Sequence, residues 1–385
     1  MGGLRLRPTA TGRATSGALA RLGGARTGHD HAAMPRLKRV DCSGPGIRRR
    51  RRGRGFAFYD ENGERVEDEE VLARIRDMAI PPAWQDVWIC PHPMGHIQAT
   101  GSDAAGRRQY RYHDKWRERQ DARKFDDMVR FARALPAMRK AVEADLARPQ
   151  LDRLRVLGCA VRLLDIGFFR IGSEDYAEKN ETYGLATIRK EHVSLEDGAI
   201  RFDYPAKSGQ RRIQSVADPE VFEIVAALKR RRGGHSELLA YREGRTWRDL
   251  KSDEINDYIK ELSGGSFTAK TFRTWNATVL AAICLATRGR DGRSRTARKR
   301  AISAAAKEVS HYLGNTPAVC RASYIDPRVI DRYEAGLTIA ERLAELAVPG
   351  EDAPVSDIAV DEQAEWAVLD LIDGDADSPV VEKAA

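Results

Sequence analysis

Four widely spaced side chains, Arg170, Lys207, Arg273 and Tyr324, are of the types needed to attack a phosphodiester. A phenol has a pKa near about 10, so it attacks phosphorus only where fixed cations favour the developing negative charge. Arginine suits that task because its planar guanidinium donates two parallel hydrogen bonds to phosphate oxygens and keeps its proton. One tyrosine and a few arginines occur by chance in a chain with 65 Lys and Arg. The case for each candidate residue therefore depends on the sequence around it.

The two arginines have apolar neighbours. Arg170 lies in the segment Gly-Phe-Phe-Arg-Ile-Gly, residues 167–172, which predicts a guanidinium near the core. Such a group must find an anion, and a protein carboxylate is a commoner partner than a ligand phosphate. Arg273 lies at the start of a predicted apolar helix, where backbone N–H groups favour an anion. Lys270 lies one turn before Arg273 on the same face.

Two polar residues lie at predicted turns. Lys207 begins a Lys-Ser-Gly turn between predicted strands, where a lysine is ordinarily a solvated charge. Burial against DNA and other cations would lower its pKa and make it a proton donor to a leaving alkoxide. Asn315 follows Gly314, which is predicted to cap a helix ending at Leu313. The ordinary role of Asn315 is local capping; its functional role would be to donate an amide N–H to a phosphate oxygen.

The helices and strands that must position these residues are predicted from the sequence. They indicate an α+β fold in four parts. Residues 1–54, rich in arginine and poor in apolar residues, are expected to be a disordered basic tail. Residues 55–120 read as a small β-rich domain of short strands separated by turns. Residues 121–348 have helical periodicity and form a mainly α-helical catalytic domain that contains a small three-stranded sheet. Residues 349–385 are expected to be an acidic, mostly disordered tail with one weak amphipathic run at 364–372.

The strands and helices of the two domains are predicted from their periodicity. In the first domain, strands are expected at 56–59, 88–90, 96–100 and 109–112, with a helix near 69–76. In the second, the runs 185–188, 199–202 and 211–215 predict a meander with Lys207 at a hairpin tip. The helices expected after this meander are 219–230, 253–262, 268–287, 298–313 and 339–347.

Charge and composition limit the class of partner. The 385 residues carry a formal charge of +8, with +12 in residues 1–54, −10 in residues 351–385 and +6 between them. A basic body suits a polyanion, most often nucleic acid, although surface cations also keep proteins soluble.

The five cysteines are isolated, as in a cytosolic protein with reduced thiols, and predict neither a disulfide nor a zinc site. No apolar run approaches the roughly 20 residues of a membrane helix.

Taken in order, these residues resemble the type IB DNA topoisomerases, in particular their poxvirus-like and bacterial branch. The likeness runs from about residue 81 to residue 346. The segments that carry it are Phe-Phe-Arg-Ile-Gly at 168–172, Asn-Glu-Thr-Tyr-Gly-Leu at 180–185, Lys-Ser-Gly at 207–209, Lys-Thr-Phe-Arg-Thr at 270–274, Leu-Gly-Asn-Thr-Pro at 313–317 and Arg-Ala-Ser-Tyr at 321–324.

The resemblance implies a role for each candidate. Tyr324 would be the nucleophile that forms a 3′-phosphotyrosyl intermediate, and Arg170 and Arg273 would bind the scissile phosphate. Lys207 would be the general acid for the departing 5′ oxygen, in relay with Lys270.

The resemblance also implies that the residue at position 315 is a second phosphate donor. Many members of the family carry histidine at the position of Asn315. The amide keeps a neutral N–H donor but cannot carry charge.

The β-rich domain would clamp DNA. The resemblance implies DNA contacts for Gln109, Tyr110 and Tyr112, and Arg108 lies beside them. A strand with one buried face would explain half of this pattern equally well.

The implied activity is relaxation of supercoiled duplex DNA by single-strand cleavage, strand rotation and religation, without ATP, metal or other cofactor. The sequence contains neither a P-loop nor an acidic metal motif. The implied partner is double-stranded DNA, bound by a monomer in the cytoplasm at the nucleoid. A tyrosine recombinase shares the Arg, Lys, Arg, Tyr order but usually carries His-x-x-Arg where this chain has Lys270 and Arg273. In a non-enzymatic DNA-binding protein, Tyr324 would be structural.

Overall fold

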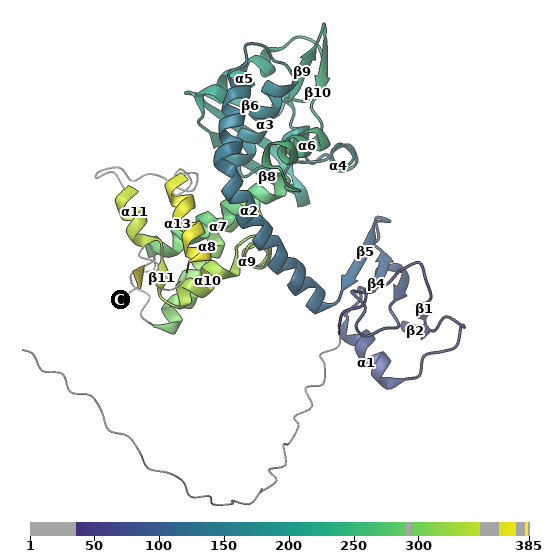
Figure 1. The fold of residues 1–385 in the computed structure, drawn as a ribbon. Coiled ribbons are helices and arrows are strands. Elements are labelled where there is room, and N and C mark those ends of the chain that lie inside the picture. The colour runs from purple at the N-terminus through teal and green to yellow at the C-terminus, as the bar shows by residue number, and fades with distance from the viewer. Residues whose placement is uncertain (1–35, 289–293, 347–361, 375–381, 384–385) are drawn as a thin grey trace, which may run out of the picture. The chain divides into compact units, whose positions relative to one another are not determined.

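The computed structural model describes residues 36–288, 294–346, 362–374 and 382–383. The chain divides into two compact units, Met1–Trp116 and Arg117–Ala385, and each is described by itself. The predicted α+β class is confirmed, because a β-rich unit precedes a mainly helical one that holds a small sheet (Figure 1). No helix among the described residues is long and apolar enough to cross a lipid bilayer.

The first unit is an antiparallel five-stranded sheet packed on one helix. The strands are β1 Ile47–Arg52, β2 Gly55–Tyr59, β3 Gln85–Ile89, β4 Ile97–Ser102 and β5 Arg108–Tyr112, in the order β2-β1-β3-β4-β5, and the helix is α1 Glu69–Asp77. Asp68 caps α1 by accepting hydrogen bonds from the backbone N–H groups of its first turn. Ile75 of α1 packs against Ile47, Val87 and Ile89 on one face of the sheet.

The prediction that residues 1–54 are disordered is wrong for residues 36–54, and residues 1–35 lie outside the described part of the chain. Strand β1 carries the arginine run and pairs with β2 along its length. This pairing leaves most of the charges exposed: Ile47 is buried and Arg49 is half-buried, while Arg48, Arg50, Arg51 and Arg52 lie at the surface. The prediction of disorder used only the high charge and low apolar content of the segment. It could not take into account that β1 pairs with a neighbouring strand.

The second unit is mainly helical. Its first helices are α2 Asp114–Leu146, which begins at the end of the first unit, α3 Arg153–Gly167, α4 Glu174–Asn180, α5 Pro219–Arg230 and α6 Ser252–Ser263. The later ones are α7 Ala269–Arg288, α8 Arg295–Leu313, α9 Pro317–Ser323, α10 Pro327–Glu334 and α11 Ala340–Leu346. Five of these confirm the predicted helices to within three residues at each end. Helix α7 is the centre of the unit, because Phe272, Trp275 and Leu280 are almost fully buried.

The small sheet has the predicted number of strands but a different first strand. Its strands are β6 Val193–Glu196, β7 Ala199–Ala206 and β8 Gln210–Val216, in the order β6-β7-β8. The predicted strand 185–188 is instead a 3₁₀ turn, η1 Leu185–Thr187. The N–H groups of Leu185 and Ala186 donate to the carbonyls of Arg170 and Ile171, so they are not available to a sheet. The hairpin tip at Lys207 is confirmed as η3 Lys207–Gly209.

A separate two-stranded hairpin, β9 Ala240–Glu243 and β10 Thr246–Asp249, was not predicted.

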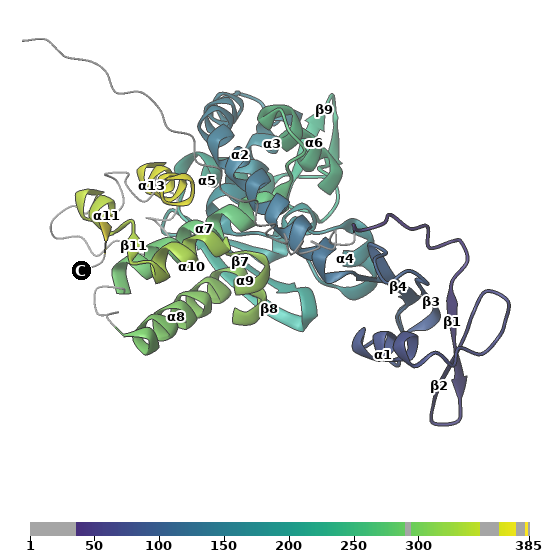
Figure 2. The same cartoon turned by 60° about the horizontal axis from the view of Figure 1, so that its bottom comes forward.

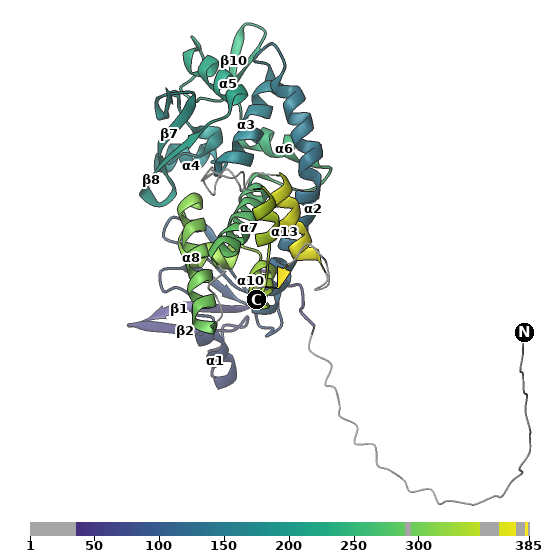
Figure 3. The same cartoon turned by 90° about the vertical axis from the view of Figure 1, so that its left-hand side faces the viewer.

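The weak amphipathic run expected at residues 364–372 of the acidic tail is a helix. Helix α13, Glu362–Asp373, packs against α7, α10 and α11 (Figure 3). Its Glu365 accepts hydrogen bonds from Arg139 of α2 and from the indole nitrogen of Trp275, at 2.6 and 2.8 Å. A short strand, β12 Glu382–Lys383, pairs with β11 Leu337–Thr338. Residues 349–361 and 375–381 of the predicted tail lie outside the described residues.

Candidate active site

Arg273 is fixed at the centre of the candidate site by the ends of two other helices. It lies in the second turn of α7 and is 4% exposed. Its guanidinium donates to the carbonyl of Phe168, at the C-terminus of α3, and to that of Leu313, at the C-terminus of α8, the latter at 2.9 Å. Phe168 has a left-handed backbone, with φ of 56°, which is costly for an aromatic residue and is kept only where the surroundings impose it.

Arg170 is held by a close approach of two backbone segments. The N–H of Leu185 donates to its carbonyl at 2.8 Å. A Cβ on Gly184 would come within 2.4 Å of the backbone nitrogen of Gly172, so glycine is required at this crossing. The Arg170 guanidinium donates to the carbonyl of Gly314 at 2.7 Å and to the side-chain oxygen of Asn315.

Tyr324 is the C-cap residue of α9, and its backbone N–H donates to the carbonyl of Cys320 at 2.9 Å. The buried hydroxyl of Thr278 in α7 donates to the Tyr324 carbonyl at 3.2 Å. The same hydroxyl accepts from the N–H of Asp326 at 3.1 Å. These contacts fix the backbone on both sides of the tyrosine. The central carbon of the Arg273 guanidinium lies 5.5 Å from the centre of the phenol ring.

The charges of the site shift the pKa values of both Tyr324 and Arg273. Burial raises the pKa of the Tyr324 phenol, but the positive charges of Arg273 and Lys270 lower it, so that the net value lies below its usual range. Burial lowers the pKa of Arg273 to about 10, with a further contribution from Arg170. The guanidinium therefore remains charged at neutral pH and stabilises the phenolate.

A third guanidinium, that of the half-buried Arg212 in β8, lies in the same cluster. It donates to the carbonyls of His311 and Tyr312 in the last turn of α8, the former at 2.9 Å. Burial lowers the pKa of Arg212, and the positive charge of Arg170 lowers it further. The sequence argument missed this residue. Strand alternation separates it from Arg211, which pairs with Asp203 on the other face, but the sequence alone does not say which arginine points to the site.

None of the three guanidiniums, of Arg170, Arg212 and Arg273, has a carboxylate partner within the described part of the chain. The protein carboxylate that was the commoner expectation for Arg170 is therefore not what the structure shows. All three donate instead to carbonyls at the C-terminal end of α8, the end of a helix that attracts cations. Backbone carbonyls leave the net charge of the cluster uncompensated, which favours an anionic ligand beside Tyr324.

Asn315 joins the cluster directly after α8. Gly314 caps the helix with φ of 59°, as predicted. The side-chain oxygen of Asn315 accepts from Arg170, and its side-chain nitrogen is buried without a hydrogen-bond acceptor among the described residues. A buried donor without an acceptor is costly, and a phosphate oxygen would satisfy it. The capping role belongs to Gly314, so the amide side chain is available for a ligand.

The two candidate lysines differ in position. Lys270 is exposed on the first turn of α7, close enough to Tyr324 to lower the pKa of its phenol. It lines a cleft with Lys124, whose ammonium group donates to the carbonyl of Ser323 at 3.2 Å. Lys207 is exposed at the β7–β8 tip, and no hydrogen bond or ion pair described for this unit joins it to Tyr324. It lies three residues beyond the rung formed by Tyr204 and Arg212, roughly 10 Å along the hairpin.

The residues predicted to touch DNA in the first unit lie together on β5. The rings of Tyr110 and Tyr112 stack with centres 6.0 Å apart and are 45% and 37% exposed. Arg108 is exposed and donates to the hydroxyl of Thr100 at 3.2 Å. Gln109 alternates to the other side of the strand and donates to Asp103 at 2.9 Å. Their contact with DNA remains a prediction.

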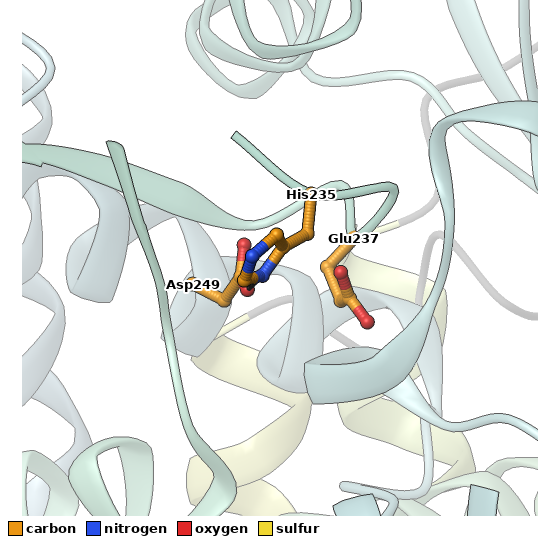
Figure 4. A group of neighbouring side chains, drawn as sticks. All are labelled: His235, Glu237 and Asp249. Carbon is orange, nitrogen blue, oxygen red and sulfur yellow. Dashed lines mark hydrogen bonds and ion pairs between the residues drawn. The ribbon is translucent and has the colours of Figure 1, made fainter. Parts of the chain in front are cut away.

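Away from this cluster, His235, Glu237 and Asp249 place three possible metal ligands within 4.8 Å of one another (Figure 4). His235 Nδ1 lies 2.6 Å from a carboxylate oxygen of Asp249. Two ligands of one tetrahedral zinc ion would be about 3.4 Å apart. The nearby Arg231 also interacts electrostatically with both carboxylates. The arrangement fits local hydrogen bonding better than a metal site.

Comparisons with known proteins agree with this geometry. Residues 113–346 match the family model of the eukaryotic DNA topoisomerase I catalytic core, and residues 55–103 match that of the bacterial DNA topoisomerase IB N-terminal domain. The chain is 30% identical to DNA topoisomerase 1B of Acanthamoeba polyphaga mimivirus over 75% of its own length and 88% of that protein. It is 21% identical to DNA topoisomerase 1 of rabbit fibroma virus over 71% and 88% of the two lengths.

A cellular relative matches over a shorter stretch. DNA topoisomerase 1 of Schizosaccharomyces pombe is 30% identical over 47% of this chain, which spans only 20% of that protein. The matches favour the topoisomerase over both alternatives, the recombinase and the non-enzymatic DNA-binding protein. A β-rich unit of the bacterial type, the catalytic core that follows it, and the mimivirus similarity together show that this chain belongs to the type IB DNA topoisomerases, which are DNA-binding isomerases.

Proposed function

We propose that this chain relaxes supercoiled duplex DNA through a covalent bond between Tyr324 and a 3′ phosphate, without ATP or metal. One observation carries the proposal: the phenol of Tyr324 lies beside guanidiniums that have no carboxylate partner among the described residues. Preorganised donors of this kind stabilise charge that develops in a transition state.

In the cleavage step, the Tyr324 oxygen loses its proton to solvent and forms a bond to phosphorus, and the bond from phosphorus to the 5′ oxygen breaks. Arg170 and Arg273 donate to the nonbridging oxygens, whose negative charge grows in the transition state. The free N–H of Asn315 donates to one of the same oxygens. The departing 5′ oxygen takes a proton from Lys207.

Religation is the reverse of this step. The 5′ hydroxyl returns its proton to Lys207, attacks phosphorus and displaces the Tyr324 phenolate. Between the two steps the 5′ end rotates about the intact strand. The bond energy is kept in the phosphotyrosine, so the cycle needs no external energy source. Tyr324 and the arginines come from one chain, which supports action as a monomer.

The proposal is tested with negatively supercoiled plasmid in EDTA without ATP. The wild-type chain should produce a ladder of partly relaxed topoisomers, and Tyr324→Phe should produce none, although it should still bind DNA. Relaxation at the wild-type rate by Tyr324→Phe would show that another group is the nucleophile. A recombinase would instead join or exchange specific sites when given two DNA partners.

A further inference from the structure

The arginine strand β1 has a surplus of unpaired positive charge. Its sequence is Ile-Arg-Arg-Arg-Arg-Arg. Arg49 is held in place: it donates to the carbonyls of Pro81 and Trp84 at 3.1 and 2.6 Å, and it stacks on Phe56. The other four arginines of the strand are exposed, and none of them forms an ion pair with a described residue. A row of unpaired like charges on adjacent residues is costly in the free protein and is relieved by a polyanion.

The register of the sheet decides which way these arginines face. Ile47 packs towards α1, so Arg49 and Arg51 share the α1 side and Arg48, Arg50 and Arg52 lie on the opposite side. Figure 2 shows the hairpin that β1 forms with β2. In this hairpin, Arg50 also stacks on Tyr59, at 4.8 Å from the ring centre.

The same register connects β1 to the tyrosines of β5. Arg48 pairs with Trp88, Trp88 pairs with Thr100, and Thr100 pairs with Tyr110. Cross-strand partners point to the same side of a sheet, so Tyr110 lies on the side that carries Arg48. Trp88 and Thr100, which lie between them, are each 1% exposed, so the arginines of β1 and the tyrosines of β5 are two separate exposed parts of this side. We call this side the outer face and define it by one set of residues: Arg48, Arg50, Arg52, Arg108, Tyr110 and Tyr112.

We infer that the outer-face arginines of β1, Arg48, Arg50 and Arg52, bind the sugar–phosphate backbone of duplex DNA, on the same side of the sheet as the tyrosines of β5. This rests on the proposed function, since it takes DNA as the substrate, and it adds a strand that lies before residue 55, where the match to the bacterial N-terminal domain begins.

The spacing of β1 fits a nucleic-acid backbone. Alternate strand residues are about 6.7 Å apart, which is close to two base-pair steps of about 3.4 Å each. Arg48, Arg50 and Arg52 therefore span roughly four base-pair steps. Their planar forks match phosphate oxygens, and the stacked tyrosines of β5, on the same side beyond β3 and β4, add the aromatic groups that accompany basic ones in nucleic-acid sites.

The test is the salt dependence of equilibrium binding to a fluorescent duplex. The full chain carrying Tyr324→Phe is used throughout, so that no covalent complex forms. Each lost phosphate contact lowers the slope of log affinity against log salt concentration by about 0.9. Replacing all three β1 arginines of the outer face, R48Q/R50Q/R52Q, should therefore reduce the slope by about 2.7.

Two variants control for charge. The variant R51Q/R76Q removes two charges from exposed arginines of the same unit that do not lie on the outer face, and it should keep the slope. The variant R48K/R50K/R52K keeps the charge and should also keep the slope, with weaker affinity. Arg52→Gln, next to the hairpin turn, should lower the slope by about 0.9 even if the triple variant is unstable.

An unchanged slope in both R48Q/R50Q/R52Q and Arg52→Gln would overturn the inference. A loss of slope of about 1.8 in R51Q/R76Q would also overturn it, because general charge would then explain the effect. These outcomes leave the role of Tyr324 intact. Failure of the Tyr324→Phe parent to bind duplex DNA at any salt concentration would instead overturn the proposed function and the inference together.

Discussion

Arg273→Ala tests the site most sharply, because Arg273 contacts both the frame of the site and the nucleophile. Of the causes that lower the pKa of Tyr324, the charge of Arg273 is the largest. Loss of one preorganised donor to a developing oxyanion costs about 2.7–4 kcal/mol, or roughly 10²–10³ in rate. We therefore expect cleavage of a duplex under single-turnover conditions to slow by at least that factor.

The same change should shift the pH dependence of cleavage. Removing the cation raises the pKa of the phenol, so a smaller fraction of Tyr324 is ionised at any pH below that pKa. The rise of the cleavage rate with pH should therefore move to higher pH in Arg273→Ala. A slower reaction with an unmoved pH profile would refute the claim that Arg273 acts on the phenol.

The structural cost can be measured separately. Arg273→Ala leaves the carbonyls of Phe168 and Leu313 without this donor, and each buried unsatisfied group costs about 1–3 kcal/mol. The free energy of unfolding should fall by about 2–6 kcal/mol in urea titration. Arg231→Ala is the matched control, because Arg231 is also buried and donates to backbone carbonyls, those of Leu228 and Leu238, but does not contact Tyr324. It should lose stability and, while folded, cleave at the normal rate.

Three further substitutions test the frame of the site. Thr278→Val removes the hydroxyl between the two backbone segments at the nucleophile; we expect slower single-turnover cleavage with unchanged DNA affinity, and equal rates would contradict this role. Gly184→Ala puts a Cβ 2.4 Å from the backbone nitrogen of Gly172; plasmid relaxation should fall steeply, and a normal rate would show that the crossing can open. Glu365→Ala leaves Arg139 with one of its two carboxylates; urea titration should show a loss of about 3–5 kcal/mol, and a change below about 1 kcal/mol would mean that α13 is dispensable.

The grouping of the main candidate residues could be predicted because it depends on residue type and order, while their catalytic roles stay proposals. Arg170, Arg273 and Tyr324 lie in segments with recognisable neighbours, and the structure brings them together. Asn315 follows a glycine whose capping role is visible in the sequence. Lys207 was correctly placed at a hairpin tip, but its approach to the phosphate depends on bound DNA and stays a prediction.

The parts that could not be predicted depend on long-range pairing. Arg212 contributes because β8 runs beside the end of α8, a contact between residues about 100 positions apart. The segment 185–188 has the composition of a strand, yet its N–H groups bond to the Arg170 segment. Helix α13 lies in a strongly acidic segment, and its burial depends on Arg139, more than 200 residues earlier.

The most direct test of the account is to identify the atom that bonds to DNA. A duplex that loses a short 3′ fragment after cleavage would trap the covalent complex, and the attached peptide would be sequenced by mass spectrometry. We predict that the 3′ phosphate is attached to the oxygen of Tyr324, and that Tyr324→Phe forms no adduct. An adduct on another residue, or relaxation without any covalent complex, would contradict the central claim.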